Sequence, residues 1–288
     1  MALSASLGRV QQVDLPGGRI RYYETGEGAP VVFVHGLLVN ADLWRKVVPG
    51  IEAAGYRCLT PDWPLGSHEI PVPTADLTPT GVADLISAFL DRLDLADVTL
   101  VANDTGGAIT QVLLTRDRSR IGRVVLASVD SYDKFLPQPF KLLPLLARIP
   151  GALRPLTESM RVRALHRSPM AFGWVAKRPV PPEIADSYLL PSRNSAAIRK
   201  DLRRLLKTLN NRYTLEAAKH FPDIDIPILI AWAREEKLFP IADAERLARE
   251  FPTATLRFID DSYTFLPEDQ PELLTRAILE FTRLHATP

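Results

Sequence analysis

The sequence predicts an α/β fold in which a mostly parallel central sheet is flanked by helices. Continuously apolar runs, such as Val31–Val34 and Val98–Ala102, alternate with segments of helical apolar spacing, such as Thr80–Leu93. Strands that alternate with helices form parallel sheets through right-handed crossovers. The chain has 288 residues, of which 46% are hydrophobic and 24% charged, and this suits one large domain with an insertion.

Each strand follows from its residue pattern. Gly18–Glu24 alternates polar and apolar residues, as a half-exposed strand does, whereas Val31–Val34, Val98–Ala102 and Ile228–Trp232 are apolar runs typical of buried strands. Three further strands are expected at Tyr56–Thr60, Val124–Ser128 and Thr255–Ile259.

Helices are expected between these strands. One begins near Asn40 or Asp42, and the others have apolar residues at helical spacing. They cover Thr80–Leu93, Ala108–Leu114 and Pro271–Leu284.

Residues 135–212 interrupt this alternation with prolines and short helical pieces. We expect a helical cap here, which divides the core into residues 1–134 and 213–288. Its expected helices are Leu142–Ile149, Met160–Leu165, Pro182–Leu190 and Ser195–Leu209. Its aromatic and methionine side chains are candidates to line an apolar pocket for a small or medium apolar substrate, among them Phe135, Phe140, Met170, Phe172 and Trp174.

The formal net charge of +1 gives no reason to expect nucleic acid or acidic surfaces as partners. The single cysteine, Cys58, cannot form an internal disulfide, which favours a reducing, cytoplasmic location. The first ten residues lack the pattern of a signal peptide, and no apolar run approaches the length of a membrane span. We therefore expect no membrane partner, and a monomer or a homodimer.

The strongest functional signal lies at Val98–Ala108. An apolar strand breaks at Asn103-Asp104-Thr105-Gly106-Gly107 and resumes as a helix. A sharp strand-to-helix turn with one polar side chain at its apex is the context of a nucleophile elbow. Ala102 and Gly106 supply the small neighbours that such a turn needs, and Asp104 is the apex. The alternative is an ordinary turn with Asp104 as helix N-cap.

Together with His35-Gly36 after one strand and Asp62 after the next, this turn resembles the α/β-hydrolase fold. An Asp at the apex resembles the haloalkane dehalogenase and epoxide hydrolase branch. Ala233–Pro240 is similar to the late acid loop of that branch, and Asp261–Pro271 to its histidine loop. The resemblance implies a nucleophilic Asp104 that forms an ester, which a histidine-activated water then hydrolyses.

Three residues depart from that pattern. Thr264 stands where the resemblance places the catalytic histidine, and a threonine cannot act as a general base near neutral pH. Thr105 and Leu37 stand where dehalogenases usually have the Trp and Asn that hold the leaving halide. These departures argue against an ordinary haloalkane dehalogenase.

The remaining site residues are assigned by the resemblance. The backbone N–H groups of Leu37 and Thr105 are expected to form an oxyanion hole. Asp130 and Glu236 are alternative catalytic acids. His35 is expected to brace the early loop, and His68 is a candidate to replace the missing base. An epoxide hydrolase would also need ring-opening tyrosines, for which Tyr132 and Tyr188 are available by type.

No cofactor is expected, because the sequence has no Cys/His cluster with metal-ligand spacing and no complete dinucleotide or phosphate fingerprint. The leading hypothesis is hydrolysis of a halide, epoxide or ester with Asp104 as nucleophile or base. A lyase, isomerase or cyclase that uses Asp104 for proton transfer is the alternative, and the loss of the histidine suits it better. A ligand-binding or ester-trapping variant is a third hypothesis.

Overall fold

The computed structural model describes residues 5–286, and its centre is one sheet of eight strands in the order β1-β2-β4-β3-β5-β6-β7-β8. β2 runs antiparallel to both of its neighbours, and every pair from β4 to β8 is parallel. The predicted mostly parallel α/β sheet is therefore confirmed. The strands are β1 (Arg9–Leu15), β2 (Gly18–Thr25), β3 (Pro30–Val34), β4 (Arg57–Pro61), β5 (Val98–Asp104), β6 (Ile121–Val129), β7 (Ile228–Ala233) and β8 (Ala254–Ile259).

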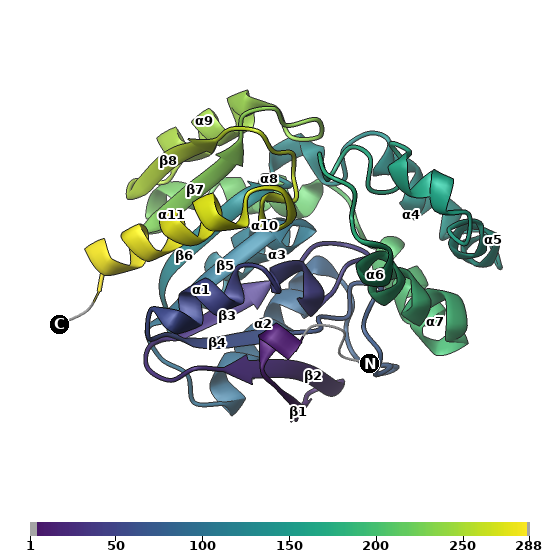
Figure 1. Cartoon of the computed structure of the whole chain (residues 1–288), viewed down its shortest axis with the longest axis horizontal. Coiled ribbons are helices and arrows are strands. Elements are labelled where there is room, and N and C mark those ends of the chain that lie inside the picture. Colours follow the sequence, from purple (N-terminus) through teal and green to yellow (C-terminus); the bar gives the residue numbers. More distant parts are fainter. Residues whose placement is uncertain (1–4, 287–288) are drawn as a thin grey trace.

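Helices cover the sheet in two groups. α2 packs against α3 and α3 against α8, while α1 packs against α11; α1 and α11 lie in front of the sheet in Figure 1. The α-helices of the core are α1 (Val48–Ala53), α2 (Pro79–Arg92), α3 (Thr105–Leu114), α8 (Arg212–Ala218), α9 (Ile241–Glu250), α10 (Leu266–Asp269) and α11 (Pro271–Leu284). Its short 3₁₀ helices are η1 (Ala5–Leu7), η2 (Ala41–Trp44), η3 (Tyr132–Lys134) and η6 (Phe221–Asp223).

The 135–212 segment forms a separate helical group beyond one end of the sheet (Figure 1). It contains η4 (Phe140–Leu142), α4 (Leu143–Leu146), α5 (Leu153–Ser159), η5 (Arg163–Arg167), α6 (Pro182–Asn194) and α7 (Ala196–Leu206). No helix among residues 5–286 is long and apolar enough to cross a membrane.

Local signals set several helix boundaries. The Thr78 hydroxyl accepts a hydrogen bond from Gly81 N–H and Pro79 opens α2, as expected of an N-cap followed by proline. The Asn40 side chain accepts from Asp42 N–H and starts η2, which confirms a helical start there, although that piece is only a 3₁₀ turn.

Two sequence expectations were wrong. The expected helix Met160–Leu165 is not present: α5 ends at Ser159, and Arg163–Arg167 is a 3₁₀ helix. The first strand, β1, was missed because most of its residues are exposed and it lies at the edge of the sheet. An edge strand with one partner lacks the apolar run that marks a buried strand.

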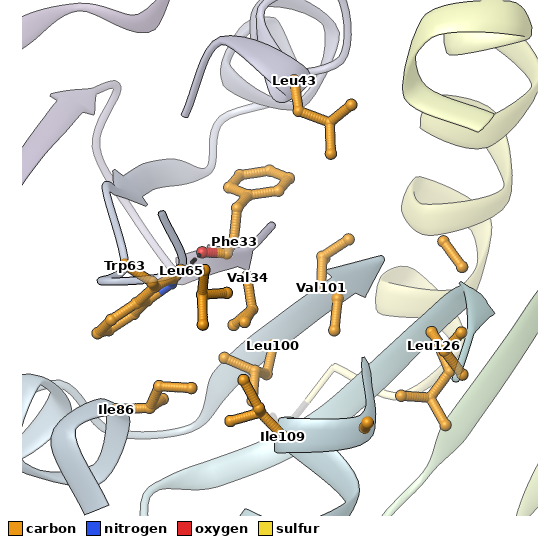
Figure 2. Packing of buried hydrophobic residues seen from close by; sticks show 14 of the residues in the cluster. Phe33, Val34, Leu43, Trp63, Leu65, Ile86, Leu100, Val101, Ile109 and Leu126 are labelled. Carbon is orange, nitrogen blue, oxygen red and sulfur yellow. Dashed lines mark hydrogen bonds between the residues drawn. The ribbon is translucent and has the colours of Figure 1, made fainter. Parts of the chain in front are cut away.

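The core centres on the parallel strands. Phe33, Val34, Leu100, Val101 and Leu126 are fully buried and pack with residues of the flanking helices (Figure 2). The buried Trp63 indole N–H donates to the Phe33 carbonyl oxygen at 3.0 Å, so that this large side chain is inserted without an unpaired donor. This packing holds β3 and β5 in place. The loops that follow these two strands therefore start from fixed positions.

The start of α3 lies very close to its neighbours. A Cβ atom added to Gly107 would lie 2.1 Å from Val129 Cγ1, and one added to Gly106 would lie 2.5 Å from two backbone carbonyl oxygens. These glycines therefore allow helix α3 to approach β3 and β6.

Gly107→Ala should lower the free energy of unfolding by about 2 kcal/mol, because an added methyl group in a filled core causes overpacking. Gly50→Ala in α1 is the comparison, and a smaller loss is expected there, since the nearest atom to its added Cβ is Cγ2 of the partly buried Thr275 at 2.7 Å, which can shift. Urea unfolding of both variants measures the difference. Equal stability of Gly107→Ala and the wild type would contradict this account of the turn.

Candidate active site

Asp104 is the last residue of β5, and α3 begins at the next residue. Its backbone has φ 55° and ψ −133°, a conformation that is uncommon for a residue other than glycine. Its side chain does not make the hydrogen bond of an N-cap, which would come from the second or third residue of α3, so the ordinary N-cap alternative does not describe it. Strain of this kind concentrates at functional sites, where the surrounding structure maintains it.

Two backbone N–H groups hold the Asp104 carboxylate. Leu37 and Thr105 both donate hydrogen bonds to it, and both lower its pKa. The loop after β3 lies so close that a Cβ atom on Gly36 would fall 2.2 Å from Asp104 Oδ2. The two donors expected to form an oxyanion hole therefore bind the Asp104 side chain itself.

A second carboxyl group lies beside the first. Asp130 is fully buried after β6, and its Oδ2 accepts a hydrogen bond from Thr105 Oγ1 at 3.0 Å. Burial and the neighbouring Asp104 charge raise the pKa of Asp130 well above its usual range. Two carboxyl groups this close cannot both ionise, so Asp130 keeps a proton while Asp104 titrates.

Burial raises the pKa of Asp104 to about 7, and the charge of Glu236 adds to the rise. The N–H groups of Thr105 and Leu37 and the hydrogen bond from Asp130 act in the opposite direction. Asp104 is therefore close to half ionised at neutral pH, which is the range in which a carboxyl can both accept and donate a proton.

Glu236 and Thr264 meet at the end of β7. Thr264 Oγ1 donates to Glu236 Oε1 at 2.6 Å, and the same oxygen accepts from the N–H groups of Lys237 and Leu238 at 2.9 and 3.0 Å. Burial raises the pKa of Glu236. Thr264 is fully buried and is not among the residues that line the cavity described next.

Asp104 faces a cavity of about 100 Å³. Its walls come from the loop after β3, from Phe265 and from the 135–212 segment, and they consist mainly of leucine, phenylalanine, methionine and valine. Among the lining residues within the described part of the chain, Asp104 is the one ionisable side chain. The hydroxyls of Thr157 and Ser192, which also line the cavity, donate to carbonyl oxygens of their own helices.

Residues 29–271 match the family model of the alpha/beta hydrolase fold. The chain belongs to this family. A 2-hydroxy-6-oxononadienedioate/2-hydroxy-6-oxononatrienedioate hydrolase from Burkholderia vietnamiensis is 27% identical over 282 residues, which cover 92% of this chain and 91% of that protein. A cis-3-alkyl-4-alkyloxetan-2-one decarboxylase from Shewanella oneidensis is 27% identical over 273 residues, which cover 90% and 84%. A haloalkane dehalogenase from Psychrobacter cryohalolentis is 34% identical over 109 residues, which cover 37% of this chain and 36% of that protein.

Solved structures show the same fold. A haloalkane dehalogenase from Agrobacterium tumefaciens aligns with a TM-score of 0.79 at 23% identity, over 98% of this chain and 99% of that one. An epoxide hydrolase aligns with a TM-score of 0.79 at 18% identity, over 96% and 99%. At these identities the likeness concerns the fold alone.

The histidines of this α/β hydrolase lie away from the cavity lining. His35 is fully buried; its Nε2 accepts from Trp63 N–H at 2.9 Å, so its Nδ1 donates to the Gly36 carbonyl oxygen. Burial lowers the pKa of His35 to about 4, which keeps it neutral. His68 lies 3.5 Å from Asp201 of α7, and the structure does not bring this proposed replacement base to the cavity.

The aromatic candidates also lie elsewhere. Trp174 is 39% exposed and does not line the cavity, whereas Phe140, Met170 and Phe172 do. The hydroxyl of Tyr132 donates to Glu250 at 2.9 Å, and burial raises the pKa of Tyr188 well above its usual range. Neither tyrosine is among the lining residues, so no ring-opening phenol is placed beside Asp104.

Asn103 was not identified from the sequence. Its side-chain amide is fully buried and donates to the Thr264 carbonyl oxygen at 2.7 Å and to the Ala127 carbonyl oxygen. It thereby connects β5 with β6 and with the loop of Thr264. A polar residue in an otherwise apolar strand, directly before the apex, was the available signal.

The stability of Asp104→Asn relative to the wild type should increase between about pH 4 and pH 8. The folded pKa of Asp104 is about 7, above its value of 3.8 in an unfolded chain, so ionisation in this interval destabilises only the folded wild type. The difference should reach at most about 4 kcal/mol, because one pKa unit corresponds to about 1.4 kcal/mol. Denaturant unfolding at several pH values measures it.

Asp225→Asn is the control, because the Asp225 side chain is 88% exposed. A stability difference for Asp104→Asn that does not change with pH would show that this carboxyl is not perturbed.

Proposed function

We propose that this α/β hydrolase is an enzyme for a small apolar substrate in which Asp104, at a nucleophile elbow, transfers a proton. The observation that carries the proposal is a single carboxyl group with a pKa of about 7 in a mainly apolar cavity lining that contains no histidine among the residues described. A general base works best when its pKa lies near the working pH. The apolar walls increase its reactivity by excluding water.

The site lacks the parts for ester hydrolysis. A nucleophilic Asp104 would need a base to activate water, but Thr264 is hydrogen-bonded to Glu236, and His68 lies beside Asp201. The groups expected to hold a halide are absent as well, since Thr105 and Leu37 offer backbone N–H groups that already bind Asp104. A reaction that Asp104 completes by itself therefore fits best.

Asp130 supports this role. It keeps its proton at neutral pH and lies in hydrogen-bond contact with Asp104. When Asp104 accepts a proton from the substrate, its negative charge beside Asp130 disappears, and the pair carries no net charge. Lyase, isomerase and cyclase reactions need such a step, and the decarboxylase among the relatives is an example of a reaction other than hydrolysis in a similar chain.

A second candidate is attack by Asp104 on an electrophilic carbon to give a lasting ester. The observation that favours it is the pair of backbone donors at the carboxylate, which would stabilise the ester carbonyl oxygen. The carboxylate oxygen forms the new bond to carbon, and a halide or epoxide oxygen leaves with the electron pair. A hydrolase and a haloalkane dehalogenase are among the relatives.

Nitrobenzisoxazole, a small apolar compound that opens when a base removes its ring proton, should be converted by the wild type. The rate should rise with pH and level off above about pH 7, as Asp104 ionises. Asp104→Asn should lower the rate at least about 100-fold, since a positioned base contributes about 10²–10⁴. Absorbance of the phenolate product measures it, with Asp225→Asn as control. A rate that survives Asp104→Asn would exclude Asp104 as the base.

Intact-protein mass spectrometry after incubation with alkyl bromides and epoxides separates the two candidates. We expect neither a lasting adduct nor alcohol product from the wild type, because Asp104 acts on protons. A stable adduct that is absent from Asp104→Asn would establish the second candidate instead. In that case Thr264→His should release the adduct as free alcohol, since it places a base beside Glu236.

A further inference from the structure

Charge is distributed very unevenly along this chain. Residues 135–212 contain 15 of the 35 Lys and Arg residues but only 4 of the 34 Asp and Glu residues. The rest of the chain has 20 basic and 30 acidic residues. The formal net charge of +1 gave no reason to expect acidic surfaces as partners, but it is the sum of a strongly basic segment and an acidic remainder. Such asymmetry is typical of proteins that bind polyanions or membranes.

Part of this basic charge lies in residues 141–170, which include α4 and α5 at the end of the molecule away from the sheet (Figure 1). This stretch has six basic residues and one acidic residue, Glu158. Arg161 pairs with Glu158 at 2.6 Å and Arg163 with Asp186 at 2.9 Å. The other four are exposed and have no carboxylate within 4.0 Å among the residues described: Lys141, Arg148, Arg154 and Arg167.

Large apolar side chains are exposed in the same stretch. Leu142, Leu145 and Ile149 are 53%, 56% and 53% exposed, and their spacing of three and four residues places them on one face of the helical run at α4. Val162 and Leu165 are 55% and 38% exposed at the start of η5. A 3₁₀ helix has three residues per turn, so these two side chains also point the same way.

We propose that residues 141–170 form a basic–apolar surface that binds an anionic lipid bilayer at its interface. Unpaired Lys and Arg side chains are attracted to anionic headgroups, and exposed Leu, Ile and Val side chains enter the boundary between headgroups and acyl chains. An acidic protein as partner would form ion pairs with the arginines, but it would not account for the exposed aliphatic side chains, as a bilayer does. The acidic remainder of the molecule is repelled by the same bilayer, and this orients the protein with α4 and α5 towards the lipid.

The surface also adjoins the route to Asp104. Met170 lines the cavity and is 38% exposed, and the partly buried Leu156 and Met160 line it as well. The proposed lipid-binding stretch therefore supplies part of the cavity wall. We expect a lipophilic substrate dissolved in the bilayer to enter the cavity through this wall.

Vesicle sedimentation with the full chain tests the proposal. We expect binding to vesicles of phosphatidylcholine with about one-third phosphatidylserine, weaker binding to pure phosphatidylcholine, and loss of binding in high salt. The triple variant Arg148→Gln, Arg154→Gln, Arg167→Gln should bind about 100-fold more weakly, since each basic residue at an anionic surface contributes about fivefold. Replacing Leu142, Leu145 and Ile149 together by Ser should also weaken binding at least about tenfold.

Matched controls come from the core. Arg249, Arg276 and Arg283 are exposed arginines without an ion pair in the described residues, and their triple Gln variant should bind like the wild type. The matched apolar control replaces the exposed leucines by Ser: Leu215, Leu273 and Leu284. Thermal melting establishes that each variant is folded.

The proposal is overturned if the wild type does not bind anionic vesicles, or if the core variants lose as much binding as the 141–170 variants. It is also overturned if size-exclusion chromatography shows that the basic surface instead joins two copies through the acidic core. Asp104→Asn should bind vesicles like the wild type. The proposal of lipid binding and the proposal of proton transfer at Asp104 can therefore be refuted independently of each other.

Discussion

The site depends on one constraint, which is a carboxylate held against two backbone N–H groups at a strained turn. The N–H groups at Asp104 come from Leu37, in the loop after β3, and from Thr105, the first residue of α3. β3 and β5 must therefore end side by side, and Val34 of β3 does pair with Ala102 of β5. This contact requires close approach of the backbone at Gly36 and Gly106. Asp104 has a positive φ at this turn, and the surrounding contacts maintain that strained conformation.

The loops are fixed before any substrate arrives. His35 connects the loop after β3 with the loop after β4 through Trp63 N–H, and Asp62 accepts hydrogen bonds from Arg21 at 2.7 Å and from Ala41 N–H at 3.0 Å. Each of these polar groups is buried and paired within the protein. The donors at Asp104 are therefore preorganised, and their electrostatic effect needs no rearrangement during the reaction.

The sequence predicted the parts of the structure that short-range patterns determine. The buried strands and the final helix Pro271–Leu284 follow from apolar periodicity, and the position of Asp104 follows from a strand, small residues and a helix. Contacts between distant segments were not predictable in the same way. His68 has the type and loop position of a catalytic base, but Asp201, far along the chain, lies beside it. Trp174 has the type of a lining residue, but it is 39% exposed and is not among the residues that line the cavity.

The absence of a histidine beside Asp104 changes the acidity of the site. An imidazolium near Asp104 would stabilise its ionised form. Here the nearby ionisable groups are the carboxyls of Asp130 and Glu236, and only neutral donors oppose the effect of burial. Thr264 stabilises this arrangement, because its hydroxyl gives Glu236 a hydrogen-bond partner without adding a positive charge. With a threonine at this position, no positive charge is added that would lower the affinity of Asp104 for a proton.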